Sequence, residues 1–221
     1  MEEAGARLLR TTHMSLKLVL MRHAETDWNR ERRYQGWRDT PLSETGRAQA
    51  EAAGRLLAVE RLAAVWSSPL QRARATAAAV ATPQGLPVNV DDAFGEMRFG
   101  EWEGFTVDEV RARFPDLHRG WLEAPDQVAP PGAETLAEVR ARAIKGLEAL
   151  RAAHDGETVC LVTHGITGRI LLLEALGLGL DRLWSLHVSL TGISELEFRD
   201  DWAVVHRMNT LVHLERLAAA G

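Results

Sequence analysis

Two arginines and two histidines lie where predicted strands and helices meet. Arg22 and His23 come directly after the apolar run 18–21, and His164 ends the predicted strand 157–164. Arg72 falls in the first turn of a predicted helix. Ligands of open parallel sheets bind at the carboxyl ends of the strands, and helix N-termini attract anions. Since arginine binds phosphate oxygens in bidentate fashion, these four residues predict a cationic pocket for a phosphoryl group.

Each of these residues also has a structural explanation when it is taken alone. A single histidine at a strand end is more often structural than catalytic. Arg22 could be an ion-pair partner, and Arg72 with Arg74 could form a solvated helix face. The P-loop, dinucleotide-binding, zinc-protease and serine-hydrolase motifs are all missing from the sequence, which weakens those functional classes.

The elements that would position these residues alternate along the chain. Strands are predicted at 16–21, 62–66, 86–90, 157–164, 192–198 and 202–208. Helices are predicted at 43–58, 68–81, 133–154 and 165–176, with Ser43 and Ser68 as N-caps and Pro69 opening its helix. The last two strands form a hairpin around Asp200 and Asp201. This order predicts an α/β three-layer sandwich with an open, mostly parallel sheet flanked by helices on both faces.

The length of 221 residues fits one domain, which we place at 14–221. Residues 1–13 are predicted to be an N-terminal tail, with Met14 as a plausible true start. A lid-like segment at about 97–132 is rich in tryptophan, glycine, proline and acidic residues. We expect it to form loops and short helices over the edge of the sheet.

The overall composition limits which binding partners and which cellular compartment we expect for this protein. The net charge of −5 gives no sign of nucleic acid or a membrane surface as a partner. No apolar run reaches the roughly 18–20 residues of a membrane span, and the start lacks the apolar stretch of a signal peptide. Cys160 is the single cysteine, so no intrachain disulfide can form. We read it as a core residue and expect a cytoplasmic protein.

Four segments, taken in order, resemble the histidine phosphatase superfamily, also called the phosphoglycerate mutase-like family. They are LMRHAETDWN, SSPLQRARATA, GEMRFGEWEG and VTHG, and the resemblance runs from about Leu16 to the end of the chain. The sequence departs from the family's Arg-His-Gly triplet at Ala24. That difference matters if the backbone there needs a positive φ.

The resemblance implies a role for each matching residue. His23 would be the nucleophile that forms a phosphohistidine, and Glu96 would give a proton to the leaving oxygen and later activate water. The transferring phosphoryl group would be bound by Arg22, Arg72 and His164. Further phosphate contacts would come from Asn29 and the Gly165 N–H, and Gln35 and Gly36 would lie near the substrate. Glu101 and Glu103 are the rival carboxylates, and we expect them to face solvent or fix the loop.

The chemistry predicted from these residues needs no metal and no cofactor. Phosphoryl transfer leaves a protein mostly positioning and charge stabilisation, which two arginines and a cationic His164 could supply. Neutral histidine is a competent nucleophile, and a hydrogen bond to its second nitrogen would fix the tautomer. Glu96 must be protonated when attack begins.

Three functions are weighed on this basis. The preferred one is a metal-independent phosphomonoester hydrolase of the small phosphatase branch, because the lid-like segment is compact and lacks a basic insertion. Trp102, Phe105, Trp121 and Leu122 would either line its pocket or simply pack the lid. A phosphoglycerate mutase primed by 2,3-bisphosphoglycerate is the alternative, and an inactive phosphate-binding protein is a third. The expected partner is a small phosphorylated metabolite, with a homodimer left open.

Overall fold

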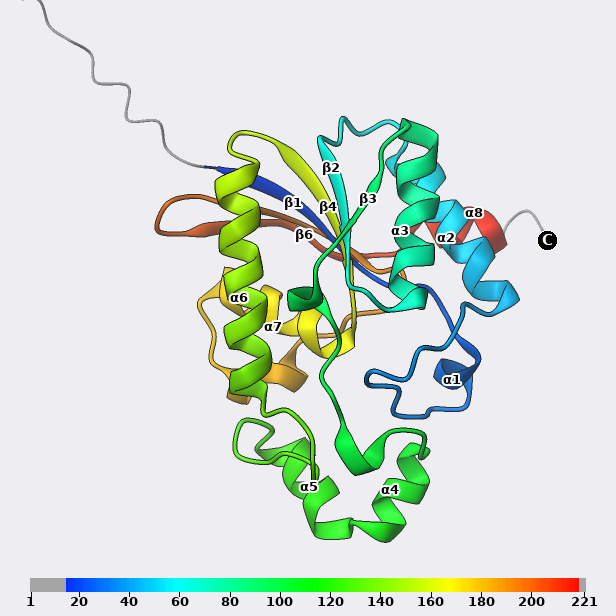
Figure 1. Ribbon diagram of the computed structural model, residues 1–221, viewed down its shortest axis with the longest axis vertical. Coiled ribbons are helices and arrows are strands. Elements are labelled where there is room, and N and C mark those ends of the chain that lie inside the picture. Colours follow the sequence, from blue (N-terminus) through cyan, green and yellow to red (C-terminus); the bar gives the residue numbers. More distant parts are fainter. Residues whose placement is uncertain (1–14, 219–221) are drawn as a thin grey trace, which may run out of the picture.

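A single six-stranded sheet forms the centre of the computed structural model, which describes residues 15–218 (Figure 1). Its order is β3-β2-β4-β1-β5-β6. The strands are β1 (Leu16–Arg22), β2 (Ala64–Ser67), β3 (Val88–Val90), β4 (Thr158–Thr163), β5 (Ile193–Phe198) and β6 (Ala203–Thr210). The first four strands of that order are mutually parallel, while β5 runs antiparallel to both of its neighbours. The predicted mostly parallel sheet and the hairpin at its edge are therefore confirmed.

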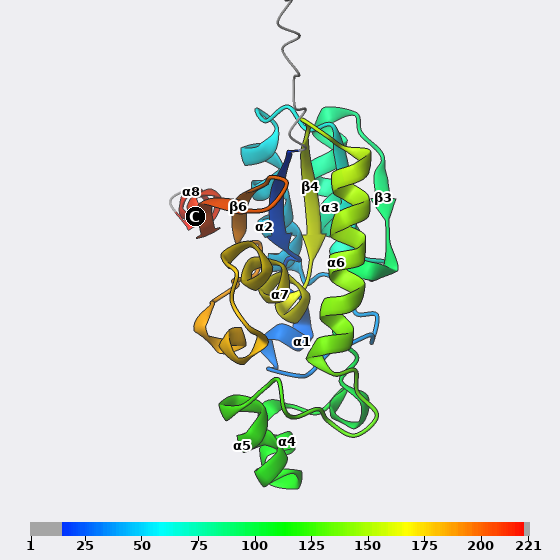
Figure 2. The ribbon, with the colours of Figure 1, turned by 90° about the vertical axis from the view of Figure 1, so that its left-hand side faces the viewer.

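Helices cover both faces of the sheet, as the two views in Figures 1 and 2 show. The helices α6 (Leu136–Ala153) and α7 (Gly165–Leu176) pack on one face, and α2 (Glu44–Leu57), α3 (Gln71–Ala81) and α8 (Val212–Ala218) lie on the other. The three-layer sandwich predicted from the alternation of elements is thus confirmed. None of the helices in the described range 15–218 is long and apolar enough to cross a membrane.

The side chains of β1 show how one strand serves two cores. Leu16, Leu18 and Leu20 belong to the core beneath α6 and α7, while Val19 and Met21 belong to the core beneath α2 and α3. Successive side chains of a strand point to opposite faces, so a strand covered on both faces must be apolar throughout. Residues 18–21 have this composition, while Lys17 near the start of the strand is exposed, and Arg22 follows the buried run directly.

The start of α3 differs from the sequence prediction. Ser68 does not cap this helix and Pro69 does not open it, because α3 begins at Gln71 with Leu70 in an extended conformation before it. The Asp39 carboxylate, from a distant loop, accepts the Gln71 N–H at 2.6 Å. Ser43, in contrast, caps α2 as predicted, with its Oγ accepting the Gly46 N–H at 2.9 Å.

The segment predicted as lid-like contains short helices and loops, in agreement with its sequence. It includes η3 (Gly100–Trp102), α4 (Val107–Arg113) and α5 (Pro115–Glu123), which lie beyond the end of the sheet near α1 (Asp27–Arg30) in Figure 1. The remaining elements are the 3-10 turns η1 (Thr82–Gln84), η2 (Asp92–Phe94) and η4 (Leu180–Ser185). The predicted tail and its boundary at Met14 lie outside the described residues.

Candidate active site

The ends of two neighbouring strands bring the predicted histidines together. β1 and β4 pair in parallel with Arg22 opposite Thr163, and the His23 N–H donates to the Thr163 carbonyl at 2.8 Å. His164 follows Thr163 directly and is the N-cap residue of α7. The imidazole centroids of His23 and His164 are 5.1 Å apart. Both rings therefore meet at the carboxyl edge of the sheet, where ligands of such folds bind.

Hydrogen bonding and burial set the tautomer and the charge of the His23 ring. Its Nδ1 is 2.7 Å from the Ala24 carbonyl oxygen. A carbonyl oxygen only accepts, so Nδ1 carries the hydrogen and Nε2 keeps its lone pair. The side chain is buried, and this burial, with the charges of Arg72 and Arg22, lowers the pKa of His23 well below 6.5. The ring is therefore neutral at physiological pH.

The replacement of glycine by Ala24 causes no backbone strain. Positive φ angles at non-glycine positions are found only at Arg32, Thr191 and Asn209 among the described residues, so Ala24 stays in an ordinary region. Its methyl group is buried beside Leu42. The triplet Arg-His-Ala thus fits this fold without rearrangement.

Arg22 and Arg72 contact backbone carbonyl groups and keep unpaired donors. Arg22 Nη1 donates to Val188 O at 2.8 Å, and Arg72 donates from Nη1 to Arg38 O at 2.9 Å and from Nη2 to Gly36 O at 2.8 Å. Burial lowers the pKa of each arginine to about 10, which leaves both charged at neutral pH. The buried Nε atoms of both have no hydrogen-bond partner.

His164 is also part of this incompletely satisfied cluster. Its Nε2 lies 2.6 Å from Ser68 Oγ, and its buried Nδ1 has no partner. Burial and the nearby Arg72, His23 and Arg22 lower the pKa of His164 well below 6.5. The imidazole of His164 is therefore neutral in this structure, whereas the sequence predicted a cationic His164 during phosphoryl transfer. Unpaired buried polar atoms cost roughly 1–3 kcal/mol each, so an anion that satisfied them would be held firmly.

The Glu96 carboxylate lies at the N-terminus of α7. It accepts hydrogen bonds from the backbone N–H of Gly165 at 2.9 Å, Ile166 at 3.1 Å and Thr167 at 3.3 Å. Backbone N–H groups at a helix start favour an anion, which explains this position. The Gly165 N–H, predicted to contact phosphate, donates to the Glu96 carboxylate in this structure.

The other predicted substrate-binding residues surround the same cavity. Asn29 and Gln35 are held by Thr26, whose Oγ1 lies 2.9 Å from Asn29 Oδ1 and 3.1 Å from Gln35 Oε1. These contacts occupy the amide oxygens, so the NH₂ groups of both side chains are left to donate.

Gly36 acts through its backbone. It adopts φ +52°, and an added Cβ would lie 2.0 Å from Glu103 Oε1. That oxygen accepts the N–H groups of Trp37 and Phe99, each at 3.1 Å. Glu103 therefore fixes the loop, as predicted, while Glu101 is exposed.

A cavity of about 750 Å³ opens onto these groups and contains all nine predicted site residues except His164, which lies buried beside it. Its lining carries six arginines, Arg22, Arg32, Arg33, Arg72, Arg111 and Arg169, against one carboxylate, Glu96. The cavity lining is therefore positively charged, although the protein as a whole has a net charge of −5. Such a cavity suits an anionic ligand.

The aromatic wall predicted from the lid-like segment is only partly present. Trp121 and Leu122 line the cavity, whereas Trp102 is fully buried in the core and Phe105 packs against that core. Trp184, from η4, completes the wall, with its Nε1 donating to the Trp121 carbonyl at 2.8 Å.

Several lining residues were not among those predicted. Arg169 is the most buried of the added arginines, and it donates to Gly165 O at 3.0 Å and Leu186 O at 2.9 Å. Arg169 could have been predicted to lie near the site, because it follows Gly165 by four residues and residues four apart share a helix face. Arg32, Arg111 and Trp184 had no comparable signal, because only the folding of distant loops brings them here.

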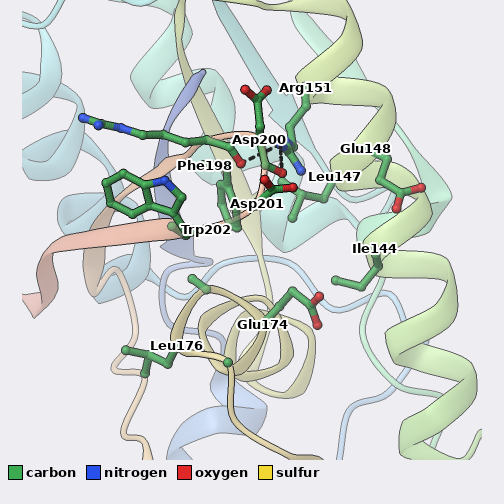
Figure 3. Close-up of a pocket in the computed structure, with 14 residues that line it drawn as sticks. Ile144, Leu147, Glu148, Arg151, Glu174, Leu176, Phe198, Asp200, Asp201 and Trp202 are labelled. Carbon is green, nitrogen blue, oxygen red and sulfur yellow. Dashed lines mark hydrogen bonds between the residues drawn. The ribbon is translucent and has the colours of Figure 1, made fainter. Parts of the chain in front are cut away.

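A second cavity, of about 440 Å³, lies at the opposite end of the sheet (Figure 3). It is bounded by α6, the end of α7 and the turn between β5 and β6. Glu148 and Glu174 line it, and Arg151 Nη2 donates to the carbonyls of Arg199 and Asp200. Its lining contains no histidine, so it does not share the chemistry of the first cavity. Across residues 15–218, no cluster of three or more His, Cys, Asp or Glu side chains is arranged to hold a metal ion.

Comparison with known proteins agrees with this geometry. Phosphoserine phosphatase 1 of Hydrogenobacter thermophilus is 36% identical over 199 residues, which cover 90% of this chain and 94% of that protein. A 2,3-bisphosphoglycerate-dependent phosphoglycerate mutase of Methylobacterium sp. is 37% identical over 173 residues, covering 75% and 83% of the two chains.

Solved structures show the same likeness. Bacillus stearothermophilus YhfR superposes with a TM-score of 0.86 at 36% identity, covering 90% of this chain and 99% of that one. A mycobacterial glucosyl-3-phosphoglycerate phosphatase in complex with VO3 gives 0.83 at 31% identity, covering 88% and 99%. The family model for the histidine phosphatase superfamily (branch 1) matches residues 18–211. The chain that carries this pair of buried histidines therefore belongs to the histidine phosphatase superfamily.

Proposed function

We propose that this protein is a phosphoric monoester hydrolase that acts through a phosphohistidine on His23. The observation that carries the proposal is the His23 Nδ1 contact of 2.7 Å with the Ala24 carbonyl. It leaves Nε2 with a lone pair in a cavity where Arg22 and Arg72 have unpaired donors. Relatives named as phosphatases support the same activity.

In the first half of the reaction, His23 Nε2 attacks the phosphorus atom of a phosphomonoester. The new N–P bond forms as the bond from phosphorus to the leaving oxygen breaks, and that oxygen takes a proton from the Glu96 carboxyl group. Arg22, Arg72 and His164 Nδ1 would bind the three oxygens of the transferring group. Developing charge is stabilised by donors already in place, which is the main task of a protein in phosphoryl transfer.

In the second half, water attacks the phosphorus atom of the phosphohistidine. Glu96 removes a proton from the water, the N–P bond breaks, and inorganic phosphate leaves with His23 neutral again. The Gly165 N–H holds the Glu96 carboxylate at 2.9 Å at the start of α7, and both residues line the cavity that contains His23.

The substrate class that fits the cavity is a small phosphorylated metabolite. Arginines surround the phosphoryl position, while Trp121, Leu122 and Trp184 offer apolar contact to the rest of the molecule. Two relatives are named for phosphoserine and glucosyl-3-phosphoglycerate, which are both phosphomonoesters that carry a carboxylate. A second anionic group on the substrate would find Arg32 or Arg111 at the cavity wall.

A phosphoglycerate mutase is the alternative, because a mutase is among the relatives and would need the same His23. The two activities differ only in what accepts the phosphoryl group from the histidine. Phosphorus NMR of 3-phosphoglycerate, with a trace of 2,3-bisphosphoglycerate and excess chelator, separates them. We expect inorganic phosphate from this substrate or from a panel of phosphomonoesters. Growth of 2-phosphoglycerate would instead identify a mutase.

His23→Ala is the control for either activity, because it removes the nucleophile but none of the arginines. Unchanged phosphate release by that variant would refute the phosphohistidine route. Loss of the wild-type activity in chelator would refute the proposed independence from metals. We further propose a cytoplasmic location, to which the single buried thiol of Cys160 is suited, and no nucleic-acid or membrane partner. Whether two copies form a homodimer is tested by light scattering.

A further inference from the structure

The guanidinium of Arg142, on α6, uses all of its N–H groups in hydrogen bonds, and Arg142 itself does not line the active-site cavity. Nη1 donates to Ala93 O at 2.9 Å and Gly95 O at 2.8 Å, and Nη2 donates to Glu96 O at 2.9 Å. Nε and Nη2 bind the Glu134 carboxylate at 2.9 and 3.1 Å. These five contacts match the five N–H donors of arginine. Three of them hold the loop that carries Glu96.

That loop has no regular structure of its own between η2 and Met97, so its carbonyls depend on outside donors. Glu96 O receives a second hydrogen bond, from Trp37 Nε1 at 2.6 Å. The same indole lies against Gly95, where an added Cβ would approach Trp37 Cζ2 to 2.5 Å. The backbone of Glu96 is therefore fixed from two sides, by an indole and by a guanidinium.

Neither Arg142 nor Trp37 lines the cavity that contains His23. Arg142 also makes no hydrogen bond or ion pair with the Glu96 carboxylate itself, since its contacts to that residue go to the carbonyl. The Arg142 charge is one of several causes that lower the pKa of His164, so it also acts on the site directly. Its effect on Glu96, by contrast, passes through the hydrogen bonds that hold the Glu96 backbone, and Trp37→Phe tests that route without a change of charge. The carboxylate then reaches the start of α7 from a fixed point, where the Gly165 N–H holds it at 2.9 Å.

We propose that Arg142 is a positioning residue that sets the Glu96 carboxyl group for proton transfer to the leaving oxygen. The inference rests on the proposed function and extends it to a residue with no substrate contact. A misplacement of about 1 Å can cost roughly 100-fold in rate, and general acid catalysis is worth about 100- to 10,000-fold. A shift of the loop should therefore impair proton donation more than it impairs phosphate binding.

Leaving groups of different basicity separate these two effects. An alkoxide needs a proton as it departs, whereas 2,4-dinitrophenolate leaves without one. The rate of phosphohistidine formation is measured by rapid quench under single-turnover conditions, with 2-glycerol phosphate and 2,4-dinitrophenyl phosphate as the two substrates. Following this step alone avoids the hydrolysis half-reaction, in which Glu96 has a second role.

For Arg142→Met we expect a fall of at least about tenfold with the alkyl ester and less than about threefold with the dinitrophenyl ester. Arg140→Met is the matched control on the same helix, since Arg140 is exposed and pairs with Glu174 at 2.7 Å. It should leave both rates unchanged. Trp37→Phe removes the other donor to Glu96 O without a change of charge, and it should give a smaller loss with the same selectivity.

An equal fall with both esters would overturn the inference, because it would show a general structural role for Arg142. Unchanged rates with both would overturn it as well. If Arg142→Met fails to fold, the same comparison of the two esters with Trp37→Phe tests the inference. The wild-type protein is measured first. If it forms no phosphohistidine with either ester, the proposed function itself is refuted, whatever the variants do.

Discussion

The two buried imidazoles make the stability of this protein depend on pH in a predictable direction. Both His23 and His164 have a pKa well below 6.5, mainly because of burial. In the unfolded chain each returns to about 6.5. As the pH falls below that value the unfolded state binds protons that the native state does not, so the free energy of unfolding falls. It rises again as the pH increases and levels off above about 7.5.

The size of the effect follows from this linkage. A histidine that stays neutral in the native state loses about 1.4 kcal/mol between pH 7.5 and pH 5.5, so the pair loses about 2.8 kcal/mol. That is a large part of the roughly 5–15 kcal/mol that stabilises a typical domain. His118 and His213 also have lowered pKa values from burial, and they add to the total for the wild-type protein.

Urea unfolding followed by tryptophan fluorescence at pH 7.5, 6.5 and 5.5, in phosphate-free buffer, measures the loss. The double variant His23→Asn/His164→Gln is the control, since it keeps polar side chains and leaves His118 and His213 in place. The wild-type protein should lose about 2.8 kcal/mol more than the control over this range. Equal losses, within about 0.5 kcal/mol, would refute the assignment of two neutral buried histidines.

Three further predictions concern the same site. Gly36→Ala should destabilise the protein by about 1–3 kcal/mol more than Gly85→Ala in urea unfolding, because both have positive φ but only Gly36 has Glu103 in the way. Ser68→Ala should lower kcat/KM about tenfold and destabilise the protein by about 1–3 kcal/mol in urea unfolding, since it removes the 2.6 Å partner of the buried His164; an unchanged rate would contradict this role. In a pH–rate profile, kcat/KM should begin to fall on the acid side only well below pH 6.5, because the pKa of His23 is lowered. A fall centred near pH 6.5 would contradict a lowered pKa of His23.

Much of the fold was readable from local pattern. The continuous apolar run 18–21 predicts a strand covered on both faces, and its side chains do divide between two cores. Ser43 before a helical pattern predicts an N-cap, which the structure confirms. The strand pattern and the N-cap both depend on residues close together in sequence, so they can be predicted from the sequence alone.

The start of α3 shows where local pattern fails. Ser68 and Pro69 have the usual composition of a helix start, yet the Ser68 hydroxyl binds His164, a residue 96 positions away. The cap is supplied instead by Asp39, 32 positions before the helix. A buried imidazole without a partner is costly, and that cost outweighs the local preference of serine for an N-cap.

The amino-acid pattern was enough to predict that two arginines and two histidines would meet at one edge of a parallel sheet, because strand ends and helix starts place them there. Glu96 was assigned to the same site only through the resemblance to the superfamily. The sequence also identified the superfamily, since four motifs in order are specific. Three features became visible only in the folded protein: the neutral His164, the Glu96 carboxylate at the start of α7, and the contacts from Arg142 to the Glu96 loop. Protonation depends on how much water is excluded, and loop position depends on donors from distant segments, so both arise only when the chain has folded.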